Sequence, residues 1–136
     1  MSITLEKATF PDLGKEQYIA LTTFRKTGKA VTTPVIFAQG PGTIYVGTRA
    51  DAGKLKRLRH TARVTLATCT YSGKVTGSVI AGNARILTES EESTAASTAL
   101  AKKYGVMLPL TRTAWRLVHR KAKADQVYIA IEPISG

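Results

Sequence analysis

The sequence is poor in cysteine and in acidic residues, and it has no long apolar run. Cys69 is its single cysteine, so an intrachain disulfide and a C-x-x-C redox or metal motif are both excluded. No stretch approaches the roughly 18 uninterrupted apolar residues that a membrane helix needs. The first residues also lack the apolar run of a signal peptide. We therefore expect a cytoplasmic protein without a membrane partner.

Several catalytic patterns are missing as well. There is no Gly-x-Ser-x-Gly elbow, no paired-carboxylate pattern and no dinucleotide fingerprint, which argues against hydrolase, glycosidase and Rossmann functions. His60 and His119 show no metal-ligand spacing, and Cys69 lies in a predicted strand, where a buried inert thiol is expected. The sequence therefore predicts no metal site, and its catalytic residues remain unknown.

What the chain has in excess is positive charge. Twenty Lys and Arg stand against nine Asp and Glu, which gives a formal net charge of +11 on 136 residues. Such a charge predicts attraction to polyanions such as phosphorylated cofactors, nucleic acid or acidic membrane surfaces. The cations concentrate in residues 49–63, where Asp51 is the only acid, and in residues 112–123, which contain none.

The length and the 43% of hydrophobic residues fit one domain, residues 1–136, around one core. Runs of apolar and β-branched residues predict six strands, at 17–25, 30–38, 43–48, 63–71, 78–89 and 126–132. The first two are expected to form a hairpin. Pro34 has no amide hydrogen, so the strand at 30–38 is expected to lie at an edge or to have a bulge or an interrupted ladder there. Gly82 predicts a bulge or a bend in the strand at 78–89.

Three segments have helical patterns. Residues 53–60 read as a short basic helix in which Leu55 and Leu58 share a face. A second helix is expected from Ser90 to Tyr104 with Gly105 after its end, and a third at 110–121. Six sequential antiparallel strands with such helical insertions predict a mainly β barrel with peripheral helices.

The start of the short basic helix offers an anion site. Free amides at a helix N-terminus, here Gly53, combined with the cations Lys54, Lys56 and Arg57, suit a phosphate. The alternative is a solvated basic helix, since runs of charge usually face water. Spacing alone does not decide between the two.

Three segments resemble a known family: TTFRKTGKAVTTPVIF, TIYVGT and AGKLKRLRHTARVTL. They are similar to the pyridoxamine 5'-phosphate oxidase-like split barrels that bind FMN or coenzyme F420, most of all to the deazaflavin-dependent branch. The resemblance runs from Tyr18 to Glu132. It implies a six-stranded antiparallel split β-barrel, a homodimer with its cofactor groove at the subunit interface, and a redox function.

The resemblance also implies a set of cofactor-binding residues. Lys54 matches the phosphate-binding lysine, Thr48 the hydroxyl at the strand end, and Lys29 a basic residue near the phosphate. The segment 33–35 matches the strand that borders the cofactor ring, although it could equally be an ordinary strand. With the helix start included, the predicted set is Lys29, Thr33, Pro34, Val35, Thr48, Gly53, Lys54, Lys56 and Arg57.

The family uses FMN or coenzyme F420, and F420 carries a phosphodiester and a polyglutamate tail. A chain this basic suits the longer anion. We therefore expect an F420H2-dependent reductase that transfers a hydride to an electron-poor small-molecule acceptor, a reaction in which the protein mainly positions the reactants.

The sequence leaves three alternatives to this reductase to be considered. One is an FMN-dependent oxidase or reductase on the same barrel, and another is a binding or storage protein for the cofactor or a tetrapyrrole. A nucleic-acid partner is not expected, because the strands lack paired exposed aromatics for base stacking. Trp115, in the second basic segment, either covers the cofactor or packs in the protein.

Overall fold

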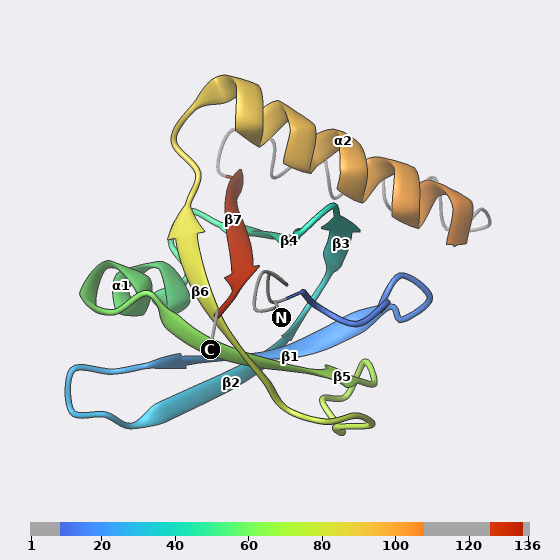
Figure 1. The fold of residues 1–136 in the computed structure, drawn as a ribbon. Helices are drawn as coiled ribbons and strands as arrows, with labels where there is room; N and C mark the ends of the chain where they lie inside the picture. Colours follow the sequence, from blue (N-terminus) through green and yellow to red (C-terminus); the bar gives the residue numbers. More distant parts are fainter. Residues whose placement is uncertain (1–8, 108–125, 135–136) are drawn as a thin grey trace, which may run out of the picture.

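The computed structural model describes residues 9–107 and 126–134, which form seven strands and two helices around one sheet (Figure 1). The sheet is antiparallel, with the strand order β2-β1-β5-β6-β7-β4-β3. The predicted helix at 110–121 and Trp115 lie outside the described residues. The elements are β1 (Tyr18–Phe24), β2 (Ala30–Val35), β3 (Phe37–Gly40), β4 (Thr43–Arg49), α1 (Gly53–His60), β5 (Arg63–Cys69), β6 (Ile80–Ile86), α2 (Ser90–Met107) and β7 (Gln126–Pro133).

The mainly β architecture is confirmed, but the strand predicted at 30–38 is two strands. It divides at Ile36 into β2, which pairs with β1, and β3, which pairs with β4. These two strands stand at opposite ends of the strand order, so the chain passes from one edge of the sheet to the other at this residue. Pro34 lies on the edge strand β2, one of the places in a sheet where a residue without an amide hydrogen is tolerated. The sheet is therefore an open, curled one, consistent with a split barrel.

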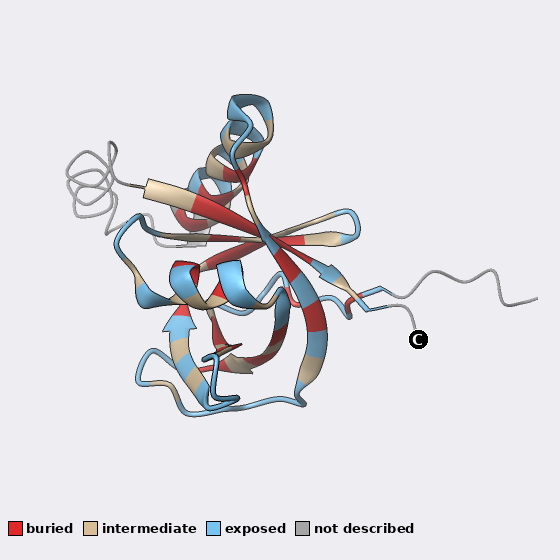
Figure 2. Ribbon diagram, turned by 90° about the vertical axis from the view of Figure 1, so that its left-hand side faces the viewer, coloured by how far each residue is buried: buried red, intermediate tan, exposed pale blue. Residues whose placement is uncertain are grey.

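Alternate residues of the strands fill the interior of this curled sheet. On β1, Ile19 and Leu21 are fully buried, and they pack with Phe37, Leu66 and Ile129 from other strands. Figure 2 shows the alternation as bands of buried and exposed residues along the strands. Because side chains alternate between the two faces of a strand, the opposite positions of β1, β2 and β5 face outward.

Helix α2 covers the outer face of β3, β4 and β7 (Figure 1). Its Leu100 and Tyr104 pack against Ala38, Tyr128 and Ala130. Both faces of β7 are thus buried, which explains its nearly continuous apolar sequence. The helix runs to Met107, so the end predicted before Gly105 was wrong, because one glycine costs too little to stop a helix that packs along its length.

Of the bulge or bend predicted at Gly82, the bulge is not formed. The ladders of β6 with β5 and with β7 run through it without an extra residue. A Cβ atom at Gly82 would lie 2.8 Å from Ile131 Cγ2 and 3.2 Å from the Glu132 carbonyl oxygen. The position therefore requires glycine because β7 packs against it.

We expect Gly82→Ala to lower the free energy of unfolding by about 1–3 kcal/mol, the usual cost of overpacking a core. Urea denaturation measures the change. Gly40→Ala is the matched control, because its Cβ atom would meet its nearest neighbour, Tyr45 Cε2, at 3.4 Å. Equal stability of the two variants would contradict this account of Gly82.

Candidate functional site

Two adjoining pockets lie between α1 and the turn that joins β1 to β2. They have volumes of about 700 and 420 Å³, and they share Arg25, Lys26 and His60. We call the two together the basic groove. The larger pocket is completed by Gly53, Lys56, Arg57 and Arg59, and the smaller one by Phe24, Gly28, Thr61 and Arg63.

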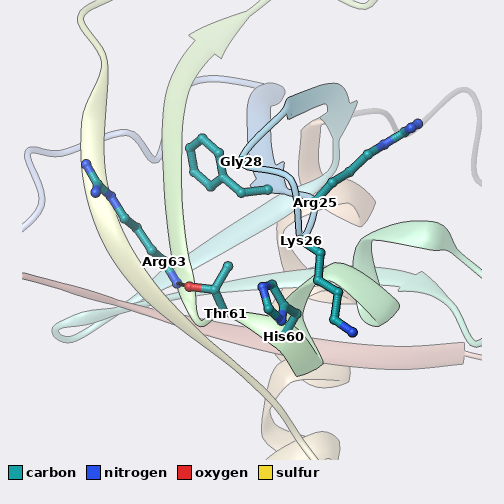
Figure 3. Close-up of a pocket in the computed structure, with 7 residues that line it drawn as sticks. Arg25, Lys26, Gly28, His60, Thr61 and Arg63 are labelled. Carbon is teal, nitrogen blue, oxygen red and sulfur yellow. Dashed lines mark hydrogen bonds between the residues drawn. The ribbon is translucent and has the colours of Figure 1, made fainter.

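The β1–β2 turn supplies one wall of the basic groove. The Gly28 amide donates to the Arg25 carbonyl at 2.8 Å, and the Arg25 amide donates to the Lys29 carbonyl at 2.9 Å. Gly28 has a φ of +90°, a conformation that favours glycine. Figure 3 shows Lys26 extending from this turn near His60, while Arg25 extends away from them. The tight turn thus places two successive cations, Arg25 and Lys26, in the lining of both pockets.

Helix α1 supplies the other wall. Its Leu55 and Leu58 are buried in the core, which leaves Lys56 and His60 exposed on the opposite side. The residue before the helix is Ala52, which provides no side-chain cap, and the first turn contains no acid. The Leu55 amide donates to the Ala52 carbonyl at 3.1 Å, so among the described residues the amides of Gly53 and Lys54 keep their capacity to bind an anion.

The charge of the basic groove is not balanced by its own lining. Six Lys and Arg side chains line the two pockets, and no carboxylate is among the lining residues. Asp51 is the only acid in residues 49–63. It accepts hydrogen bonds from the Arg49 guanidinium at 3.1 and 3.2 Å, so its charge is paired outside the groove lining. A bound anion would supply the missing negative charge.

Two cations of α1 are partly withdrawn from water. Burial, and then the positive charge of Arg57, lower the pKa of Lys54. Burial and the charge of Arg25 likewise lower the pKa of Arg57, whose Nε donates to Thr23 Oγ1 at 2.5 Å. A nearby anion would favour both charged forms and reverse these shifts.

The structure brings some of the predicted site residues together and separates others. Of the predicted set, only Gly53, Lys56 and Arg57 are among the residues that line the basic groove. Lys54 is half-buried beside it and Lys29 is exposed in the turn. Thr48 is half-buried on β4, where it pairs with Val127.

The segment predicted to border a cofactor ring lies on the edge strand β2. Thr33 is half-buried and Pro34 is exposed, whereas Val35 is buried in the core. The side chain of Val35 thus behaves as that of an ordinary strand residue, and its backbone is paired with Ile19 of β1. Sequence reasoning missed Thr23, Arg25 and Lys26, although all three stand in the segment that carries the resemblance.

The remaining sequence predictions concern the thiol and metal ligands. Cys69 is buried, and burial raises the pKa of its thiol, as expected for an inert cysteine. Among residues 9–107 and 126–134, no three His, Cys, Asp or Glu side chains are grouped to hold a metal ion. Within the same ranges, no helix is long and apolar enough to cross a bilayer.

A further cation, Lys103 on α2, lies away from the basic groove. Its Nζ is 3.4 Å from the centroid of the Phe37 ring, and it is buried without a hydrogen-bond partner among the described residues. Burial lowers the pKa of Lys103 to about 8. The ring stabilises the charge that burial destabilises.

Lys103→Met tests this balance. Because the folded-state pKa lies below the unfolded one, the unfolded chain binds more protons between pH 8 and 10, and stability should rise with pH there. We expect the variant to be more stable than the wild type at pH 7 by about 1 kcal/mol, the cation–π contact offsetting part of the burial penalty. Urea denaturation at pH 7 and pH 10 should show that advantage shrinking. A constant difference would contradict the shifted pKa.

Residues 5–134 match the pyridoxamine 5'-phosphate oxidase family. No curated protein matches the sequence. Among solved structures, the heme storage protein HutZ of Vibrio cholerae has a TM-score of 0.68 and 12% identity, over 90% of this chain and 84% of that chain. An F420 reductase has a TM-score of 0.58 and 14% identity, over 90% of both chains. A FAD-binding protein of Mesorhizobium loti has a TM-score of 0.61 and 14% identity, over 90% and 86%. Identities this low show a shared fold alone.

Proposed function

Because the chain belongs to the pyridoxamine 5'-phosphate oxidase family, we propose that it is a reductase that takes a hydride from reduced coenzyme F420. The acceptor is an electron-poor small organic molecule. The basic groove carries this proposal, because its six Lys and Arg side chains and its lack of a lining carboxylate suit a ligand with several negative charges. An F420 reductase among the proteins of the same fold supports the same cofactor.

In this mechanism the protein binds and orients its reactants. Lys56, Arg57 and the first amides of α1 hold the phosphate, while Arg25 and Lys26 attract the remaining anionic groups from the opposite wall. The edge strand β2, which among the described strands pairs with β1 alone, has outward-facing backbone groups for a ring. The bound cofactor supplies the hydride chemistry, and no acid or base of the chain is assigned a role.

We also propose that the protein is a homodimer. The residues of β1 and β2 that face away from the core carry no charge, among them Thr22, Thr32 and Pro34. In a molecule with a net charge of +11, such a face lets a second copy dock without bringing like charges together at the contact. The face ends at Phe24, which lines the basic groove, so a partner there would border the cofactor. Sedimentation equilibrium tests the assembly, and a monomer would refute it.

Titration with cofactors tests the proposed function. The purified protein is titrated separately with coenzyme F420 and with FMN, following the fluorescence of the cofactor and of Trp115, the only tryptophan. Tight binding of F420 alone supports the proposal. Tight binding of FMN, with yellow protein from purification, replaces it by the flavin enzyme. Binding without turnover of quinone or nitroaromatic acceptors indicates a cofactor carrier.

Lys54→Ala tests the phosphate-binding role that the resemblance gives to this residue. We expect F420 affinity to fall by about 1–3 kcal/mol, the range for a lost charge-assisted hydrogen bond. Fluorescence titration measures the change, and Lys102→Ala, an exposed cation on α2, is the control. Unchanged affinity would remove Lys54 from the site and leave the phosphate to Lys56 and Arg57.

A further inference from the structure

Thr23 is a hydroxyl in an otherwise apolar row. It follows Ile19 and Leu21 on the inner face of β1, and only 1% of it is exposed. A valine would have nearly the same shape there and would bury no polar atom. The hydroxyl has one hydrogen-bond partner across the interior, the Nε of Arg57 at 2.5 Å. We therefore attribute the presence of a buried hydroxyl at this position to its hydrogen bond with Arg57.

Gly53 makes room for the same arginine from the other side. A Cβ atom at Gly53 would lie 2.8 Å from Arg57 Nη1, 3.7 Å from Cζ and 3.9 Å from Nη2. The guanidinium thus folds back over the first residue of α1, one helical turn earlier. Both residues line the larger pocket, so the folded guanidinium lies at the groove.

Arg57 differs in this respect from the other cations of the groove. Lys26, Lys56 and Arg59 are exposed, and none of the described residues holds their charged ends by a hydrogen bond or an ion pair. They add charge without fixed geometry. A guanidinium held at Nε keeps its terminal amino groups, which can donate in parallel to two oxygens of one phosphate or carboxylate. It also loses less conformational entropy on binding.

We propose that Thr23 and Gly53 are positioning residues that fix the Arg57 guanidinium as the principal specificity-determining contact for an oxyanion. This inference rests on the proposed function for its site, and it adds which cation selects the ligand and how that cation is oriented. The group recognised is a phosphate or a carboxylate. The surrounding lysines raise the local concentration of anions but do not discriminate among them.

Thr23→Val, Thr23→Ser and Arg57→Gln are compared by calorimetric titration with coenzyme F420 and with inorganic pyrophosphate. Thr23→Val should weaken both ligands about tenfold, as expected for a lost orienting hydrogen bond, and Thr23→Ser should keep the wild-type affinity. In the Arg57→Gln background, Thr23→Val should change affinity no further. A merely structural hydroxyl would weaken binding equally in both backgrounds, which would overturn the inference.

Gly53→Ala approaches the same arginine from the exposed helix start, so the test does not depend on a change in the core. Alanine favours a helix more than glycine does, so the variant should be no less stable in urea. Its added methyl should still weaken pyrophosphate binding about tenfold by displacing the guanidinium. Wild-type binding in Gly53→Ala would refute the inference. If the protein binds pyrophosphate but not F420, the proposed cofactor is refuted, and the effects of the Thr23 and Gly53 variants on pyrophosphate binding still decide the role of Arg57. If it binds neither ligand, both proposals are refuted.

Discussion

Replacing Lys26 and Lys56 together by glutamate is expected to weaken F420 binding by at least about a hundredfold. The two lysines stand on opposite walls of the basic groove, one on the β1–β2 turn and one on α1. Each change removes an attraction and adds a repulsion within a few ångströms of the ligand. Both side chains are exposed, so the free energy of unfolding should stay within about 0.5 kcal/mol of the wild-type value. Fluorescence titration at low and physiological salt measures the affinity.

The control has the same net charge in another place. Each Lys→Glu change lowers the charge by two, so two changes take the chain from +11 to +7. Lys15→Glu with Lys102→Glu gives the same total on exposed positions that are not among the groove-lining residues. Because exposed charges are screened beyond about 8 Å at physiological salt, this pair should change affinity little. Equal losses in the two double variants would mean that net charge, and not the groove, attracts the ligand.

The local pattern of the sequence was sufficient for α1. Gly53 begins the helix, Leu55 and Leu58 form its buried face, and the structure gives the predicted bounds, 53–60. Such a helix is specified within one segment, by a start signal and a short apolar spacing. The same is true of the β1–β2 hairpin, whose turn is specified by Gly28.

The division of the strand predicted at 30–38 into β2 and β3 could not be predicted from the local sequence. Ile36 separates β2 from β3 because the curled sheet brings its two edges to this residue, and that curl depends on all seven strands. Likewise, a glycine inside a strand locally predicts a bulge, but at Gly82 the glycine is required because Ile131 of β7 occupies the position that a side chain would take. Contacts between distant segments decide both cases, and no local pattern contains them.

The lining of the basic groove was predicted only in part for the same reason. Lys56 and Arg57 belong to that lining, and they were predicted because they share a short helix whose start suits an anion. Arg25 and Lys26 read locally as part of a turn, and only the closure of the sheet places them opposite α1. Thr23 reads as an ordinary strand residue until its partner, 34 positions along the chain, is known. The family match supports the fold but does not assign these cations.

Phe37→Ala is expected to lower the free energy of unfolding by about 3–5 kcal/mol, the usual cost of removing a fully buried phenylalanine. The ring is 0% exposed and packs in the main core directly after the break at Ile36. The hydrogen bond from the Phe37 amide to Tyr104 Oη, at 3.0 Å, uses the backbone and remains in the variant. The loss should therefore report on the ring itself, measured by urea denaturation.

Lys103 allows the two roles of this ring to be separated. In Phe37→Ala the ammonium loses the nearer of its two aromatic partners, the Phe37 ring at 3.4 Å, and keeps the Tyr104 ring, whose centroid is 5.3 Å away. Phe37→Ala should therefore cost less when combined with Lys103→Met, by about 0.5–2 kcal/mol, the range of a cation–π contact. The four proteins of this double-mutant cycle are unfolded in urea at pH 7, where the lysine is mostly charged. Additive effects would show that the ring only fills the core, whereas coupling of this size would show that it also holds the buried charge at the point where the sheet closes.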